Sequence, residues 1–239
     1  MKKALLDKLQ ATRTRKLSAV LVTDLTTGKQ CLLTEQDQYG DLTLDYQIIA
    51  EIDRMGSADR NRTISVGGDD SHRLFIHIYN PPKRLIIVGA VHIAQSLAPM
   101  AALAGYDVTV VDPRGTFATH QRFPGVALAQ GWPDEELKKL ALDCRTAVVT
   151  LTHDPKLDDP ALISALASEA FFIGALGSRS THEQRLERLR ETGRLEEELK
   201  RIHGPVGLNI GSISPEEISI SILSQMTQVL HIPLTVHAS

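Results

Sequence analysis

The stretch RLIIVGAVHIAQSLAPMAALAGYDVTVVDPR, residues 84–114, decides the fold of this 239-residue chain. It opens with a run of branched apolar residues that ends at Gly89 and continues with apolar residues at helical spacing. A second branched run then ends at Asp112, 23 residues after Gly89. Strand, glycine turn, helix, strand and terminal acid together are typical of a dinucleotide-binding βαβ unit. We therefore predict an α/β fold with a Rossmann-like, doubly wound parallel sheet.

The glycine pattern departs from a dinucleotide site at one position. Val91 stands two residues after Gly89, where the pattern has a glycine that lets the backbone approach a pyrophosphate. Ala94 occupies the third position, which the pattern permits. The stretch thus predicts the fold more firmly than it predicts NAD(P) as the cofactor.

The composition excludes several classes of function. A formal net charge of -3 argues against broad nucleic-acid binding, which needs a basic surface, and 4% aromatic residues leave few side chains for stacking on bases. Two cysteines, Cys31 and Cys144, make no disulfide framework and lack metal-ligand spacing. The first residues lack the apolar core of a signal peptide, and no apolar run reaches membrane length, so we expect a cytoplasmic protein without a membrane segment.

Two domains are predicted. Residues 1–80 show a small α+β pattern, and Asn80-Pro81-Pro82 stiffens the chain at a boundary. Residues 83–239 alternate strand and helix patterns, which predicts a parallel sheet with helices on both faces. Within this part we expect a kink or break at Pro99, a helix that begins at Asp159-Pro160, and a last strand at Val206–Ile210.

Polar residues follow the strands of the second domain where each strand ends. The carboxyl ends of parallel strands meet at one edge of a sheet, which is where open α/β proteins bind ligands. We therefore predict a binding site formed by Gly89, His92, Asp112, Arg114, His153, Asp154, Lys156, Asp158, Gly177, Ser178, Arg179 and Gly211.

The residue types at this edge favour an anionic ligand. Lys156 and Arg179 are cations, and Arg179 stands just before a predicted helix, whose free N–H groups also attract negative charge. Asp112 has the position of a ribose-binding acid but is equally an ordinary turn residue. His153 with Asp154 fits either an acid–base pair or a turn. The arginine-rich segment around Arg185 is interpreted as a solvated helix face.

The chain contains no nucleophile elbow, P-loop, HExxH or CxxC motif. We therefore predict no catalytic residues and no metal-ligating residues. The site is expected to hold a ligand rather than to attack one covalently.

The chain from about Arg84 to Leu230 resembles the XdhC/CoxI family of accessory proteins for molybdenum hydroxylases such as xanthine dehydrogenase. The motifs that carry the resemblance are IVGAVHIAQ (87–95), GYDVTVVDPR (105–114), RFPGV (122–126), WPDE (132–135), RTAVVTLTHDPKLDDPAL (145–162), IGALGSRSTHEQRLERL (173–189) and GPVGLNIGSISPEEISISIL (204–223).

The resemblance implies a chaperone that binds molybdenum cofactor (molybdopterin), supports its sulfuration by a cysteine desulfurase and inserts it into an apo molybdenum hydroxylase. It also implies a homodimer. Helix N-termini with Arg179 and Lys156 would suit the phosphate of molybdopterin, and Asp112 or Asp158 could accept hydrogen bonds from the pterin. Two alternatives remain at this point, an NAD(P)-dependent oxidoreductase and a scaffold that only docks the partner proteins.

The N-terminal part departs from the family pattern. Many members carry a glycine-rich segment with a cysteine before the Rossmann-like part. This chain has only Gly67-Gly68-Asp69-Asp70 there, and Cys31 lies elsewhere. We therefore expect a reduced N-terminal domain without a cysteine-dependent step.

Overall fold

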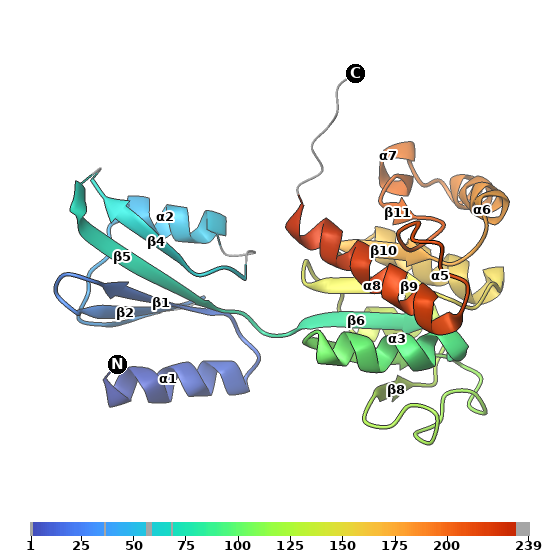
Figure 1. Ribbon diagram of the computed structural model, residues 1–239, viewed down its shortest axis with the longest axis horizontal. Coiled ribbons are helices and arrows are strands. Elements are labelled where there is room, and N and C mark those ends of the chain that lie inside the picture. Colours follow the sequence, from blue (N-terminus) through green and yellow to red (C-terminus); the bar gives the residue numbers. More distant parts are fainter. Residues whose placement is uncertain (1, 36, 56–58, 68, 233–239) are drawn as a thin grey trace. The chain divides into compact units, whose positions relative to one another are not determined.

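A computed structural model describes residues 2–35, 37–55, 59–67 and 69–232 of the chain (Figure 1). Gly68 of the glycine pair therefore lies outside the described residues. The chain divides into two compact units, Met1–Pro82 and Lys83–Ser239. Each unit has hydrophobic clusters of its own, so each is described by itself.

The first unit is an antiparallel sheet between two helices. The sheet order is β3-β2-β1-β5-β4. Leu21 packs in the cluster shared with α1, whereas its neighbour Val22 packs in the cluster shared with α2, as alternation along a strand requires. The elements are α1 (Lys3–Thr14), β1 (Ala19–Asp24), β2 (Gln30–Thr34), β3 (Gln38–Gly40), α2 (Tyr46–Met55), β4 (Arg62–Val66) and β5 (Asp69–Tyr79).

The second unit contains a six-stranded sheet in the order β11-β10-β9-β6-β7-β8, and its strand pairs are parallel. Counted from β6, this is the order 6-5-4-1-2-3 of a doubly wound Rossmann-like fold, which confirms the predicted fold class. The elements are β6 (Lys83–Val88), α3 (His92–Leu103), β7 (Tyr106–Val111), β8 (Ala127–Ala129), α4 (Pro133–Lys139), β9 (Thr146–Thr150), α5 (Pro155–Leu166), β10 (Phe172–Ala175), α6 (Arg179–Glu191), α7 (Glu196–Leu199), β11 (Ile202–His203) and α8 (Pro215–His231).

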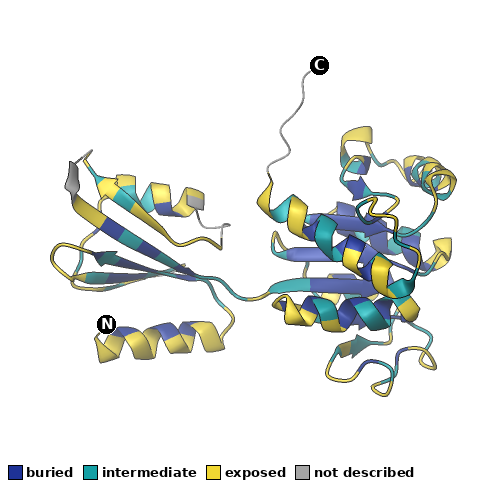
Figure 2. Ribbon diagram, in the orientation of Figure 1, coloured by how far each residue is buried: buried dark blue, intermediate teal, exposed yellow. Residues whose placement is uncertain are grey.

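Helices cover both faces of this sheet. Leu85 and Ile87 of β6 pack with α3 and α8, whereas Ile86 and Val88 pack with the cluster that includes α5. The central strands β6, β9 and β10 are accordingly the most deeply buried part of the unit (Figure 2). A strand buried on both faces needs a continuous apolar run, which explains why these strands were predicted from sequence.

Two local predictions in the second unit were wrong, and a third was wrong in part. Helix α5 begins at Pro155, with Asp154 as its N-cap, so Pro160 lies inside the helix. The segment 206–210 forms no strand, because the sixth strand is β11. Helix α3 continues through Pro99 to Leu103, so it has no early break there, whereas the alternative of a kink stays a prediction.

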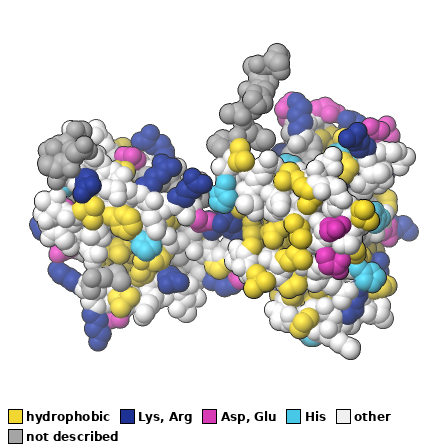
Figure 3. Space-filling model, viewed as in Figure 1, with side chains coloured by type: hydrophobic (Ala, Val, Ile, Leu, Met, Phe, Trp, Pro, Cys, Tyr) yellow, Lys and Arg dark blue, Asp and Glu magenta, His cyan; other side chains and the backbone are white. Residues whose placement is uncertain are grey.

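None of the described helices is long and apolar enough to cross a membrane. Figure 3 shows apolar side chains gathered over one face of the second unit, where α8 and α3 lie. Leu103 at the end of α3 and Ile220 of α8 are among the exposed large apolar residues.

Candidate functional site

The site lies where the chain order of the strands reverses, between β6 and β9. Gly89 ends β6 in the left-handed region, with φ of 111°. A Cβ at this position would lie 2.6 Å from Cγ2 of Thr152, which follows β9. The chain therefore needs glycine at this point because a neighbouring loop fills the space that a side chain would take. Two predicted loops, after β6 and after β9, meet here.

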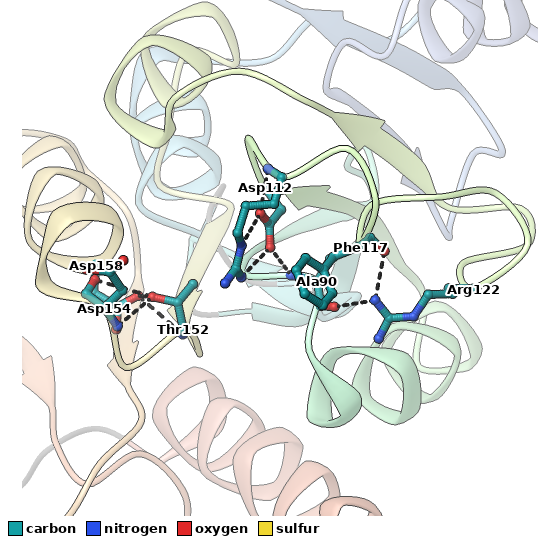
Figure 4. Close-up of polar contacts among 8 residues, drawn as sticks. Ala90, Asp112, Phe117, Arg122, Thr152, Asp154 and Asp158 are labelled. Carbon is teal, nitrogen blue, oxygen red and sulfur yellow. Dashed lines mark hydrogen bonds and ion pairs between the residues drawn. The ribbon is translucent and has the colours of Figure 1, made fainter.

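Asp112 organises the loops after β6 and β7. Its carboxylate is fully buried and accepts four hydrogen bonds (Figure 4). Oδ2 accepts from the Ala90 amide at 2.8 Å and from Nη2 of Arg114 at 2.8 Å. Oδ1 accepts from the amide of Arg114 and from its Nε, each at 2.9 Å. A carboxylate offers about four lone-pair sites, so this one has no acceptor capacity left for a ligand.

The Asp112–Arg114 pair is held in its charged form. Burial raises the pKa of the Asp112 carboxyl, but the hydrogen bonds from Arg114 and Ala90 together lower it below its usual value. The same contact raises the pKa of Arg114, whose guanidinium is partly exposed and lies 4.8 Å from the ring centroid of Phe117. The negative charges of Asp154 and Asp158, in and after the loop that follows β9, also raise the pKa of Arg114.

Arg122 is a structural residue of this edge that the sequence analysis did not identify. Its Nη1 donates to the carbonyl oxygens of Ala90 and Phe117, each at 2.9 Å (Figure 4). Its Nη2 donates to Oε1 of Gln95 at 2.9 Å. It therefore fastens the loop after β7 to the start of α3. No spacing rule singles out this arginine, although it lies in the RFPGV motif.

The loop after β9 is organised by Thr152. Its hydroxyl donates to Oδ1 of Asp158 at 2.7 Å, and it also accepts from the Asp154 amide at 3.0 Å. Asp154 in turn accepts from the amide of Lys156 at 3.0 Å as the N-cap of α5. His153 between them has φ of 61°, which is uncommon for a residue with a side chain. Asp154 is thus a capping residue, and His153 sits in a strained, exposed turn.

Asp158 differs from the other predicted site residues because it is buried with an unpaired atom. Its side chain is 2% exposed, and Oδ2 has no hydrogen-bond partner among the described residues. Burial raises the pKa of this carboxyl, against the opposing effect of the hydrogen bonds from Thr152.

Arg185 of α6 is buried, so its interpretation as part of a solvated face was wrong. It is 2% exposed, and Nη2 donates to the Leu176 carbonyl oxygen at 2.7 Å. Burial lowers its pKa, whereas Asp158 raises it. The available sequence signal was its position four residues before Leu189, on the helix face that packs inward.

The first turns of α5 and α6 open at the same edge of the sheet, because they follow the neighbouring parallel strands β9 and β10. Lys156 and Arg179 lie in these first turns, and both are exposed. Ser178 is the N-cap of α6 and accepts from the Thr181 amide at 3.1 Å. The two helices are tied together by the Asp159–Arg188 ion pair, at 2.7 Å.

Of the remaining predicted site residues, Gly177 lies beside Arg185, whereas His92 and Gly211 make no polar contact with this group as far as the structure describes the chain. Gly177, with φ of 149°, would place a Cβ 3.6 Å from Nη2 of Arg185, so it belongs to this edge. His92 and Gly211 are exposed, and neither makes a hydrogen bond or ion pair with this group among the described residues. No group of three or more His, Cys, Asp or Glu side chains is arranged to hold a metal ion within the described part of the chain.

The second unit is an open α/β domain with a Rossmann-like sheet, and comparison with known proteins places the chain in a family. Residues 85–226 match the sequence model described as the XdhC Rossmann domain. Because this match covers more than half of the chain, the chain belongs to the XdhC family.

The proteins that are similar to this chain include two curated relatives and one solved structure. The molybdenum cofactor insertion chaperone PaoD of Escherichia coli (strain K12) is 34% identical over 151 residues, which is 63% of this chain and 41% of PaoD. A probable xanthine dehydrogenase subunit of Bacillus subtilis (strain 168) is 30% identical over 161 residues, which is 67% of this chain and 47% of the relative.

A crystal structure described as a xanthine dehydrogenase from Bacillus halodurans has a TM-score of 0.74 and 26% identity. The match covers 95% of this chain and 66% of that chain. The chain spans between about a third and a half of the length of the curated relatives that it matches.

Proposed function

We propose that this chain binds molybdenum cofactor as cargo and takes part in its insertion into a molybdenum hydroxylase of the xanthine dehydrogenase type. Membership of the XdhC family and the similarity to PaoD support this proposal. The observation that carries it is the pair of helix N-termini at one sheet edge, each with an exposed cation, Lys156 or Arg179.

The residues at this edge fit the chemistry of the cargo. Molybdopterin carries a phosphate, and helix N-termini with a neighbouring Lys or Arg bind phosphate well. The pterin carries hydrogen-bond donors and acceptors, and Asp158 and Arg185 hold unpaired atoms of both kinds. Asp112 has no role toward the cargo in this proposal, because its lone pairs are occupied within the protein.

Sulfuration of the cargo would need a sulfur donor from outside this chain, and we propose a cysteine desulfurase for that role. Cys144 precedes β9, whereas the site lies at the other end of that strand, about 15 Å away at about 3.3 Å per residue. Cys31 is buried in the first unit. A cytoplasmic location and a homodimer are further proposals that rest on the unpaired cysteines and on the family resemblance, respectively.

The proposal is tested by purifying the protein from cells that make the cofactor and measuring molybdenum and released pterin per protein chain. The wild-type protein should carry both. Lys156→Ala/Arg179→Ala should lower retention by about tenfold or more, because two charge-assisted contacts to phosphate are lost. Lys3→Ala/Lys138→Ala removes two exposed cations elsewhere and should leave retention unchanged.

The two alternative functions give different results. A scaffold that only docks partners would hold an apo-hydroxylase equally well with and without Lys156 and Arg179, and it would carry no cofactor. An NAD(P)-dependent oxidoreductase would bind NAD(H) or NADP(H) in calorimetry. We expect no heat of binding at millimolar dinucleotide, because Val91 crowds the pyrophosphate position and Asp112 is occupied.

A further inference from the structure

Unpaired polar atoms gather inside the second unit between α5 and α6. Nε and Nη1 of Arg185, Oδ2 of Asp158 and Oγ1 of Thr150 are all buried and have no hydrogen-bond partner among the described residues. Thr150 ends β9, Asp158 lies in the first turns of α5, and Arg185 lies in the second turn of α6. These three residues therefore lie on neighbouring elements at the carboxyl edge of the sheet.

The charges of Asp158 and Arg185 act on each other, although the two side chains form no ion pair. Asp158 is the strongest charged neighbour that raises the pKa of Arg185, and Arg185 is the strongest that lowers the pKa of Asp158. No ion pair within 4.0 Å joins them among the described residues. A buried unpaired polar group costs free energy, so native proteins satisfy such groups with water or with a ligand.

The unpaired atoms define the ligand that would satisfy them. The guanidinium offers N–H donors, and the carboxylate oxygen is an acceptor. A simple anion would satisfy Arg185 but would be repelled by Asp158, and a cation would meet the opposite problem. A neutral group with a donor next to an acceptor satisfies both. The amino-oxo-pyrimidine edge of a pterin has this arrangement, with an amino group and a ring N–H beside a carbonyl oxygen.

We propose that Asp158 and Arg185 together form a recognition site for the amino-oxo-pyrimidine edge of a pterin. Asp158 accepts from the amino group and the ring N–H, and Arg185 donates to the carbonyl oxygen. This inference rests on the proposed function. It divides the site into one part that binds the pterin and another that binds the phosphate. Lys156 and Arg179 on the exposed helix N-termini then contact the phosphate end of the cargo.

A ligand reaches these atoms only if a covering loop moves, since both side chains are 2% exposed. We propose that the loop after β9 is the one that moves. Thr152 in this loop contacts Oδ1 of Asp158, and the exposed His153 beside it has the left-handed φ of 61°. Residues in sparsely populated backbone regions persist only where their surroundings hold them, and here the hydrogen bonds of Thr152 and Asp154 do so.

The test compares two probes that differ at one position of the ring. In 6-methylpterin the 2-position carries the amino donor, whereas in 6-methyllumazine it carries a carbonyl oxygen. Binding of each probe to the full chain is measured by calorimetry. The wild-type protein should prefer the pterin by about tenfold or more, because lumazine turns an acceptor toward the Asp158 carboxylate.

Asp158→Asn should reverse or abolish this preference, because its amide can donate to the lumazine oxygen. Arg185→Lys should weaken both probes about equally, since both carry the carbonyl that faces it. Asp159→Asn is the matched control, because it removes the carboxylate next to Asp158 on α5, which pairs with Arg188 of α6 instead of Arg185, and it should leave the preference unchanged.

Several outcomes would overturn the inference. Equal affinity of the wild-type protein for the two probes would do so without any variant. So would an unchanged preference in Asp158→Asn with only a lower melting temperature, which is the result expected if a structural water bridges the two side chains. If the chain still retains whole cofactor in these cases, the proposed function stands and only the recognition site fails. Absence of cofactor retention would instead remove the proposed function.

Discussion

Arg114 and Asp112 form an ion pair whose two members differ in exposure. The Asp112 side chain is fully buried, whereas 39% of the Arg114 side chain is exposed. Loss of the aspartate leaves a cation that water can solvate. Loss of the arginine leaves a carboxylate that water cannot reach, which is the more costly change.

We therefore expect Arg114→Ala to destabilise the protein more than Asp112→Asn does. At pH 7 the losses should be about 3 and about 1–2 kcal/mol of unfolding free energy, respectively. The measurement is urea unfolding of both variants and of Asp112→Asn/Arg114→Ala. The double variant should be more stable than Arg114→Ala alone, and an additive loss would contradict the buried-carboxylate explanation.

The pH dependence follows from the lowered pKa of Asp112 in the folded protein. The stabilisation from this carboxylate is fully present above its unfolded pKa of about 3.9 and is lost as the pH falls toward the folded pKa. In Arg114→Ala the buried carboxyl should instead have a raised pKa, so protonation relieves its cost. The stability difference between wild type and Arg114→Ala should therefore shrink between pH 7 and pH 4, as followed by urea unfolding across that range.

At the scale of elements, the contact between the loops after β6 and β9 depends on Gly89. Gly89→Ala should cost about 3 kcal/mol, from the left-handed φ of 111° and from the overlap with Cγ2 of Thr152. Adding Thr152→Ser removes Cγ2 but keeps the hydroxyl that donates to Asp158. The double variant should regain about 1–2 kcal/mol in thermal unfolding, whereas Thr152→Val, which keeps both branches, should regain nothing.

Local pattern predicted the elements of the second unit well and their ends less well. The buried runs of β6, β9 and β10 identified the sheet, because a strand that is covered on both faces is apolar along its whole length. The start of α5 was misplaced because Asp154-Pro155 and Asp159-Pro160 carry the same cap signal. Asp154 caps the helix in the structure, where its amide donates to Thr152 and its carboxylate accepts from Lys156. An Asp-Pro pair alone does not reveal these contacts.

The candidate site was predicted as an edge of the sheet but not as a set of contacts. Family resemblance and strand ends indicated Asp158 and Arg179, whereas Arg185 was interpreted as part of a solvated helix face because charged residues surround it in the sequence. It donates a hydrogen bond to Leu176 in the loop after β10, and the charge of Asp158, in the more distant α5, acts on it. Asp112 shows the reverse case, since its position indicated a ligand and its contacts turned out to be internal.

At the scale of the whole molecule, the two units have separate hydrophobic clusters, and Trp132, the single tryptophan, lies in the second unit. Leu32→Ala removes a fully buried side chain of the first unit and should cost that unit about 2–5 kcal/mol. We expect the urea midpoint by far-UV circular dichroism to fall while the midpoint by Trp132 fluorescence stays in place.

The matched variant is Leu97→Ala, which removes a fully buried leucine of the second unit and should shift the Trp132 transition. Equal shifts of both signals in Leu32→Ala would show that the units unfold as one.

The position of the two cysteines has a practical consequence. Cys31 is 1% exposed, and burial raises the pKa of its thiol, so it should react slowly. Cys144 is exposed and precedes β9, whereas the candidate site follows the other end of that strand. A maleimide reagent should therefore attach one biotin or dye per chain at Cys144. The native protein can then be immobilised on a sensor surface through the end of β9 that lies opposite the candidate site.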